Sequence, residues 1–157
     1  MGIPMGEKQI LSNRKAFHEF HVLDKLEAGI VLQGTEVKSL RMKGGMQFKD
    51  CYVDFVKGEA WLIGAHISPY EMGNVYNHKP ERPRKLLLHH REIVRWTSRV
   101  TEKGLTVIPL NVYFKEGLVK VEIGLCQGKH TYDKRASIKE RESKRELDRA
   151  IKSVRKG

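Results

Sequence analysis

Residues Leu105 to Leu125, LTVIPLNVYFKEGLVKVEIGL, contain two apolar runs on either side of the short polar turn Lys115-Glu116-Gly117. In the second run, valine, isoleucine and leucine at the odd positions 119 to 125 alternate with lysine, glutamate and glycine. A repeat of two residues places one face of a strand in the core and the other in solvent. The stretch therefore predicts an antiparallel hairpin with one buried face.

A second hairpin is predicted upstream, where the apolar runs Cys51 to Val56 and Ala60 to Ile67 flank Lys57-Gly58. Two further strands are predicted over Phe17 to Leu23 and Gly29 to Leu32. Antiparallel strands in so short a chain favour a small closed or nearly closed barrel, because closure hides the strand edges. We therefore predict a mainly β fold, an antiparallel β-barrel with a few helices.

Two helices are predicted, a short one over Thr35 to Arg41 and a longer one over Lys85 to Val100, whose apolar residues recur at helical spacing. Ser68 to Pro83, rich in proline, glycine and asparagine, is predicted to be a long loop. The run Arg82-Pro83-Arg84-Lys85 would end this loop and open the longer helix. Guanidinium groups beside helix N-terminal amides would suit phosphate oxygens.

The composition indicates a small protein with a polyanionic partner. The 157 residues carry 30 Lys and Arg against 19 Asp and Glu, a net charge of +11. We predict a flexible segment over residues 1–12, a barrel domain that would bind the polyanion over 13–128 and a basic tail over 129–157. No membrane span or signal peptide is evident, so a cytoplasmic protein is expected. Cys51 and Cys126, which lack paired spacing, are predicted to be buried free thiols.

The predicted tail, residues 129–157, contains eleven Lys and Arg against five Asp and Glu, and residues 139–146 (KERESKRE) include no apolar side chain. Such a segment has too little apolar surface to offset the entropy of ordering. Leu147, Ile151 and Val154 nevertheless recur at helical spacing. The pattern predicts a basic segment that becomes helical against a large negatively charged partner. A solvated tail that only aids solubility is the alternative.

Catalytic and metal chemistry have little support in the sequence. Of the seven histidines, His18 and His21 would lie on opposite faces of the predicted strand, and no HExxH motif, cysteine pair or acidic cluster accompanies them. We predict no metal, no cofactor and no enzymatic activity. Two alternatives stay open: a ribonuclease using His89 or His90, and a protein that binds many structured RNAs.

Six stretches, in the same order along the chain, resemble small protein B, the family of bacterial SsrA-binding proteins that partner tmRNA. They are residues 13–16 (NRKA), 27–41 (EAGIVLQGTEVKSLR), 66–74 (HISPYEMGN), 82–89 (RPRKLLLH), 103–114 (KGLTVIPLNVYF) and 133–141 (DKRASIKER). The resemblance implies an oligonucleotide-binding-type barrel and a tail that is disordered when free and helical when bound. It also implies binding to the tRNA-like domain of tmRNA, in the place of a tRNA anticodon arm.

The same resemblance implies that the complex enters ribosomes stalled on messages without a stop codon, with the tail in the empty message channel. Elongation factor Tu would join through the tmRNA complex. By position in the motifs, the tmRNA-facing residues would be Glu27, Leu87 and His89, although the helical spacing of Leu87 with Val94 also allows it a place in the core. The resemblance also implies contacts to the RNA backbone from the basic residues Arg14, Lys15, Lys38, Arg41, Arg84 and Lys85.

In the tail, the resemblance assigns Tyr132, Asp133, Lys134 and Arg135 to the ribosomal decoding centre, with Lys139 and Arg141 continuing along the message channel. Two departures from the family pattern stand out. Many members carry histidine where this chain has Tyr132, so an aromatic ring is kept but a titrating imidazole is lost. The loop over residues 42–48 (MKGGMQF) is less standard, and no RNA contact is transferred onto it.

Overall fold

The computed structural model describes residues 7–72, 77–128, 147, 149–152 and 154. A strand precedes the first helix, and six further strands and two further helices follow in the barrel region. The elements are β1 (Glu7–Ser12), α1 (Arg14–Glu19), β2 (Phe20–Ile30), α2 (Gly34–Leu40), β3 (Met46–Val56), β4 (Glu59–Ile67), β5 (Arg84–Leu87), α3 (His90–Lys103), β6 (Thr106–Lys115) and β7 (Leu118–Gly128).

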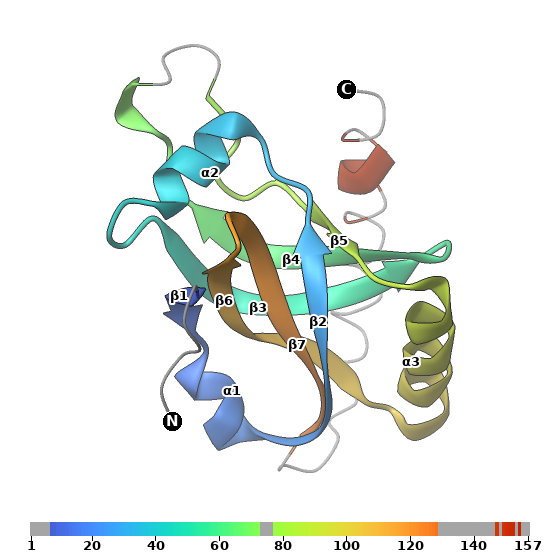
Figure 1. The fold of residues 1–157 in the computed structure, drawn as a ribbon. Coiled ribbons are helices and arrows are strands. Elements are labelled where there is room, and N and C mark those ends of the chain that lie inside the picture. The colour runs from blue at the N-terminus through green and yellow to red at the C-terminus, as the bar shows by residue number, and fades with distance from the viewer. Residues whose placement is uncertain (1–6, 73–76, 129–146, 148, 153, 155–157) are drawn as a thin grey trace.

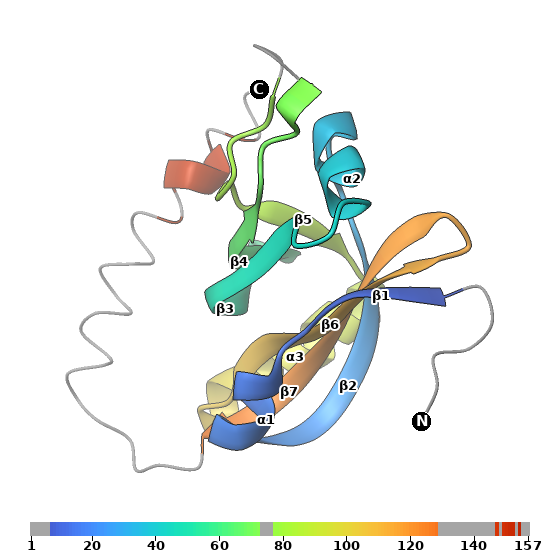
Figure 2. The ribbon, with the colours of Figure 1, turned by 90° about the vertical axis from the view of Figure 1, so that its left-hand side faces the viewer.

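The strands close into an antiparallel barrel (Figures 1 and 2). Around the ring the order is β6, β3, β4, β5, β2 and β7, and the pairing of β7 with β6 completes the closure. Strand β1 pairs with β6 outside this ring. The prediction of a mainly β fold with a barrel and a few helices is confirmed.

Both predicted hairpins are present. Strands β3 and β4 are joined by Lys57 and Gly58, and β6 and β7 by Glu116 and Gly117. All four turn residues have positive φ, from 51° to 81°. Two successive residues of positive φ give a turn whose twist matches that of the flanking strands, which explains why each turn ends in glycine.

The core fills the barrel interior with the side chains of one face of each strand. Ala60 and Leu62 of β4 are fully buried there, and Trp96 of α3 closes over the same cluster. Cys51 and Cys126 are free and buried, as predicted. Burial raises the pKa of the Cys126 thiol to about 11 and that of Cys51 still further, so both remain protonated at neutral pH.

The N-terminal region differs from the prediction. Residues 7–12, predicted to be flexible, pair with β6 as β1, and residues 14–19 form α1, so Phe17 and His18 are helical. The Asn13 side chain accepts the Ala16 N–H at 3.2 Å and fixes the helix start. Strand β2 then runs unbroken to Ile30, where two separate strands had been predicted.

The longer predicted helix was placed too early. Residues 84–87 form strand β5, which fills the gap between β4 and β2, and α3 begins only at His90. The Glu92 carboxylate accepts the His89 N–H at 2.9 Å, a capping interaction that marks the true start. The shorter helix, α2, lies where it was predicted.

Candidate nucleic-acid interface

Strands β2 and β5 lie side by side and present Glu27 and Leu87 on the same outer face. In the register of this pair, Gly29 is opposite Leu87, and Glu27 lies two residues earlier on the side of the strand that Gly29 occupies. A Cβ atom at Gly29 would lie 3.3 Å from the Leu87 Cβ, so the missing side chain leaves room for the leucine. Leu87 is 54% exposed, so the place in the core that its helical spacing with Val94 allowed is excluded.

Glu27 is held in place from the neighbouring hairpin. Tyr113 donates its hydroxyl hydrogen to Glu27 Oε2, and Lys115 Nζ lies 3.4 Å from both carboxylate oxygens. The hydrogen bond from Tyr113 is the largest cause of the lowered pKa of Glu27. Partial burial opposes this shift, and the positive charges of Lys115 and Lys120 add to it. The side chain is therefore an ionised acceptor, suited to a base amino group.

Tyr113, Lys115 and Lys120 were missed in the sequence analysis. Tyr113 is opposite Lys120 in the β6–β7 register, and Lys115 lies two residues further along β6, so all three point outward. Their alternation with the buried Val112 and Val121 was visible in the sequence. The alternation shows which residues leave the core, but only the pairing of β7 with β2 brings Glu27 beside them.

Two further predicted residues lie next to this face, Lys85 on β5 and His89 just after it. Lys85 points outward like Leu87, and its Nζ lies 3.1 Å from Glu59 Oε2. His89 is exposed in the turn between β5 and α3. The resulting group of Glu27, Lys85, Leu87 and His89 is called here the β2–β5 surface. It combines an ionised acceptor, a cation, an apolar contact and a planar ring, a set suited to structured RNA.

Arg84 is not part of that surface, and its prediction as a backbone contact is corrected. The side chain is fully buried, with Nε 2.5 Å from Glu36 Oε2 and with Nη1 and Nη2 donating to the Ala65 and Pro80 carbonyl oxygens at 2.8 and 2.9 Å. The residue opens a strand instead of a helix, and strand alternation turns it inward. The guanidinium group is therefore bound by Glu36 and two backbone carbonyl oxygens and is shielded from solvent.

Glu36 links α2, which carries the predicted contact Lys38, to the start of β5, which carries Lys85. Burial alone would raise the pKa of this carboxyl, but hydrogen bonds from Arg82, the Gln33 N–H and Arg84 lower it below its ordinary value. The network ties α2 to the segment that leads into β5. Its role is to position these elements, with Glu36 and Arg84 fully buried.

The remaining basic residues lie at two opposite ends of the barrel. Lys38 and Arg41 are exposed on and after α2, and Arg14 and Lys15 are exposed on α1. Figures 1 and 2 both show α1 and α2 at opposite ends of the molecule. Lys38 Nζ lies 5.7 Å above the Tyr70 ring, a cation–π contact. The structure therefore does not gather these cations with Glu27 into one compact site.

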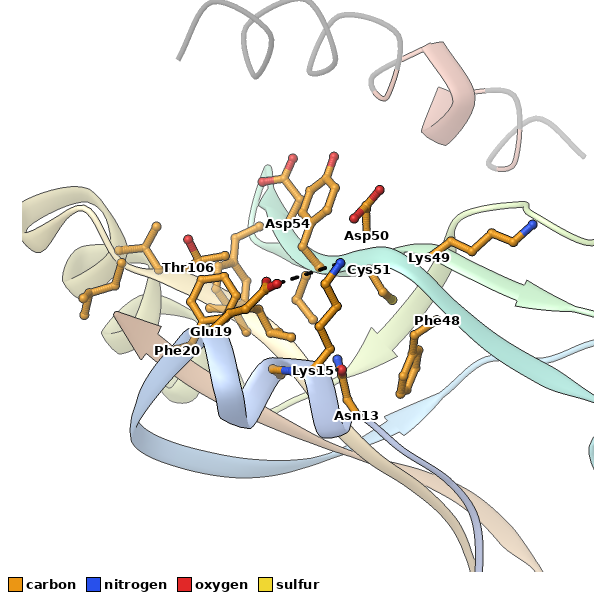
Figure 3. A pocket seen from close by; sticks show the side chains of 18 of the residues that line it. Asn13, Lys15, Glu19, Phe20, Phe48, Lys49, Asp50, Cys51, Asp54 and Thr106 are labelled. Carbon is orange, nitrogen blue, oxygen red and sulfur yellow. Dashed lines mark hydrogen bonds and ion pairs between the residues drawn. The ribbon is translucent and has the colours of Figure 1, made fainter. Parts of the chain in front are cut away.

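A groove of about 1030 Å³ lies between α1, α3 and β3 (Figure 3). It opens where β3 and β6 share a single pair, Val53 with Val107. Of the predicted RNA-binding residues it includes only Lys15, whose Nζ lies 3.9 Å from Glu19.

Within the described ranges, no group of three or more His, Cys, Asp or Glu could hold a metal ion. None of the helices in that part of the chain has the length and apolar character of a membrane span.

The tail residues assigned to the ribosome, Tyr132 to Arg135, Lys139 and Arg141, lie outside the described residues. Residues 147, 149–152 and 154 of the tail are described, and they are helical. Leu147 and Ile151 are buried, and with the half-buried Val154 they pack on the barrel. The disorder predicted for the free tail does not extend to these residues.

The model of the family described as SmpB protein matches residues 10–153. The chain belongs to the SmpB family. The SsrA-binding protein of Chlamydia trachomatis serovar A is 57% identical over 148 residues, 94% of this chain and 97% of that protein. The SsrA-binding protein of Carboxydothermus hydrogenoformans is 51% identical over 147 residues, 94% of this chain and 98% of that protein.

A solved SmpB-family structure agrees with the fold described above. A chain of the structure described as "tmRNA-SmpB: a journey to the center of the bacterial ribosome" matches with a TM-score of 0.67 and 46% identity, covering 91% of this chain and 96% of that one. The family match reaches residue 153, whereas the motifs recognised in the sequence ended at Arg141. The family match therefore covers the barrel and most of the tail, including Leu147 and Ile151.

Proposed function

We propose that this chain binds the tRNA-like domain of tmRNA through the β2–β5 surface and delivers tmRNA to ribosomes stalled on messages without a stop codon. The observation that carries the proposal is membership of the SmpB family over nearly the whole chain, together with the exposure of Leu87 beside the ionised Glu27. Together, Leu87 and Glu27 offer an RNA an apolar contact and a hydrogen-bond acceptor on one face.

Recognition is expected to depend on shape and charge more than on base sequence. Structured RNA presents phosphates, 2′-hydroxyls and unstacked loop bases, which the cations, Glu27 and the rings of His89 and Tyr113 can meet. Each phosphate neutralised by a lysine or arginine adds about 0.7 to 0.9 to the salt slope of the binding constant. An affinity insensitive to salt would contradict this mechanism.

On the ribosome, the barrel would stand where a tRNA anticodon arm stands, and the tail would enter the message channel. An intact message occupies that channel and excludes the tail, so the tail would enter only ribosomes whose channel is empty. A helix extends about 1.5 Å per residue, so the 29 residues of the tail would reach a few tens of ångströms. The chain supplies binding and position, and the chemistry of peptide transfer belongs to the ribosome.

The two halves of this proposal separate in full-length variants. Leu87→Asp should reduce tmRNA affinity at least tenfold, because it puts a second carboxylate next to the RNA, a loss of about 1.4 kcal/mol or more. The matched control is Leu23→Asp, which changes an exposed leucine on the neighbouring strand β2. Lys134→Glu with Arg135→Glu should leave affinity within about threefold while abolishing peptide tagging of a nonstop message in a reconstituted translation system.

Each outcome has a defined meaning. If Leu87→Asp binds tmRNA like the wild type, the β2–β5 surface is not the binding site. If the tail variant loses both tmRNA affinity and tagging, the tail is a general RNA-binding segment and the two-part mechanism is wrong. Equal affinity of the wild type for tmRNA and for an unrelated structured RNA would favour general RNA binding instead.

A further inference from the structure

The outer side of the β3–β4 hairpin carries a large aromatic residue that is hidden from solvent. Along β4, Ala60 and Leu62 face the barrel core, so Trp61 and Ile63 face outward. A side chain on the outside of a small barrel is expected to be at least partly exposed. Trp61 is nevertheless only 2% exposed. Something outside the barrel must cover it.

The cover is the end of the tail. Leu147 and Ile151, 5% and 2% exposed, form one cluster with Trp61, and Val154 packs against its edge. These three side chains share one face of the C-terminal turns, whereas Arg149 and Lys152 are exposed on the other. Figures 1 and 2 show these turns, in red, outside the barrel beside β4. The barrel contributes Tyr52, Val56, Trp61 and Ile63, called here the Trp61 face.

We propose that the Trp61 face is a docking site for the chain's own C-terminal segment, Leu147 to Val154, which occupies it in the free protein and leaves it when the tail enters the ribosome. The first half of this inference stands on the contacts alone. The second half, release on the ribosome, rests on the proposed function.

Three features favour docking within one chain. The segment is joined to the end of β7 by only 18 residues, 129–146, so its effective concentration at the barrel is high, in the millimolar range for short linkers. The apolar contacts remove Trp61 and Ile151 from water, which is favourable in proportion to the area covered. Asp54, opposite Trp61 in the β3–β4 register, also places a carboxylate on the face that receives a basic segment.

Other features make the docking reversible. The Trp61 Nε1–H is buried and finds no acceptor among the described residues, so it regains a hydrogen bond to water when the segment leaves. The described tail residues contribute three side chains to this cluster, a contact far smaller than a domain core. Docking of this kind shields an aromatic patch in the free protein without fixing the tail there.

Release of the segment can be measured in the full-length free protein by acrylamide quenching of tryptophan fluorescence. The chain has two tryptophans, and Trp96 is fully buried in the barrel core. Leu147→Ser with Ile151→Ser should make one of the two, Trp61, accessible to the quencher and shift the emission to longer wavelength. Arg149→Ser with Lys152→Ser, which changes the exposed side of the same turns, should quench like the wild type. Continued protection of Trp96 shows that the barrel stays folded.

If the Leu147→Ser, Ile151→Ser variant is quenched no more than the wild type, the docking site does not exist in solution. If the exposed-side variant is quenched equally, the contact is not through the apolar stripe, and the proposal is overturned as well. Neither measurement involves RNA or ribosomes, so these outcomes are independent of the proposed function.

Release on the ribosome is tested with a photo-crosslinker, Val154→p-benzoylphenylalanine, in the full-length chain. Irradiation of the free protein should link position 154 to the barrel peptides that carry the Trp61 face. Addition of tmRNA and ribosomes stalled on a nonstop message should abolish that link. A link that persists in complexes active in peptide tagging overturns the release step. Failure of the wild type to bind tmRNA or to support tagging would instead overturn the proposed function and leave the docking result intact.

Discussion

Two outer faces of the same barrel, the β2–β5 surface and the Trp61 face, are produced by the same strand alternation and end in opposite states. Leu87 is 54% exposed, whereas Trp61 is 2% exposed. Strand β5 lies between them, since its Lys85 is opposite Trp61 and its Leu87 is opposite Gly29. The comparison teaches that alternation decides which side chains leave the core, and that the rest of the chain decides which of them stay in contact with water.

The largest effect should come from breaking the strand that both faces share. Arg84→Met leaves the buried Glu36 carboxylate with one guanidinium fewer, which should lower the free energy of unfolding by about 3 to 5 kcal/mol. The matched control is Lys85→Met, the next residue, whose exposed ion pair is worth about 1 kcal/mol or less. Urea denaturation measures both. Equal losses would show that the Glu36–Arg84 pair does not hold β5 in place.

The pH dependence of stability tests the same network. The folded pKa of Glu36 lies below its ordinary value of 4.5, so its contribution is fully present above pH 4.5 and is lost as the pH falls through the lower, folded pKa. Glu36→Gln should therefore be less stable than the wild type at neutral pH, with a smaller loss of stability on acidification. Denaturation followed between neutral pH and pH 3 checks this. Parallel curves for the two proteins would contradict it.

A smaller effect should sharpen the β2–β5 side of the comparison. Gly29→Ala places a methyl group 3.3 Å from the Leu87 Cβ and should tilt the leucine from its position. We expect tmRNA affinity to fall by roughly threefold to tenfold, about 1 kcal/mol, with the fold unchanged. Gly34→Ala, where the new methyl meets nothing within 4 Å, is the control. Filter binding at fixed salt would measure both, and an unaffected Gly29→Ala would remove Leu87 from the interface.

The smallest effect concerns the ionisation of Glu27. Tyr113→Phe removes the hydrogen bond that is the largest cause of the lowered pKa of this carboxyl, so the pKa should move back toward 4.5. A ¹³C NMR titration of the Glu27 side chain reports the change directly. Lys120→Met, which removes a more distant charge, should move it less. A Glu27 pKa that is the same in Tyr113→Phe and the wild type would mean that the tyrosine does not hold the carboxylate.

The hairpins and α2 could be predicted because their determinants are local. Alternation in residues 118–125 and the Lys57–Gly58 turn depend on neighbours in sequence, and both are present as predicted. The errors fell where distant partners decide. The run RKLL (84–87) has a helical spacing with Val94, yet it became a strand because β4 and β2 both offered unpaired edges. Residues 7–12, predicted to be flexible, found the edge of β6.

The candidate site divides in the same way. Glu27, Leu87 and His89 were identified by resemblance to a family, and the structure places the first two on one face. Arg84 lies in the same motif as Leu87 and His89, residues 82–89, but its side chain is buried against Glu36 because alternation along β5 turns it inward. Tyr113 and Lys115 were missed because their proximity to Glu27 arises only from the packing of β2 on β7.

By itself, the sequence determined the two hairpins, the net positive charge and the helical spacing of Leu147, Ile151 and Val154, because each depends on the order and kind of neighbouring residues. Only the tertiary structure decided that Arg84 is internal, that Leu87 is exposed and that the tail's stripe covers Trp61. These depend on which strands pair and which surfaces meet. Such contacts join residues far apart in the chain, and their free energy belongs to the assembled barrel.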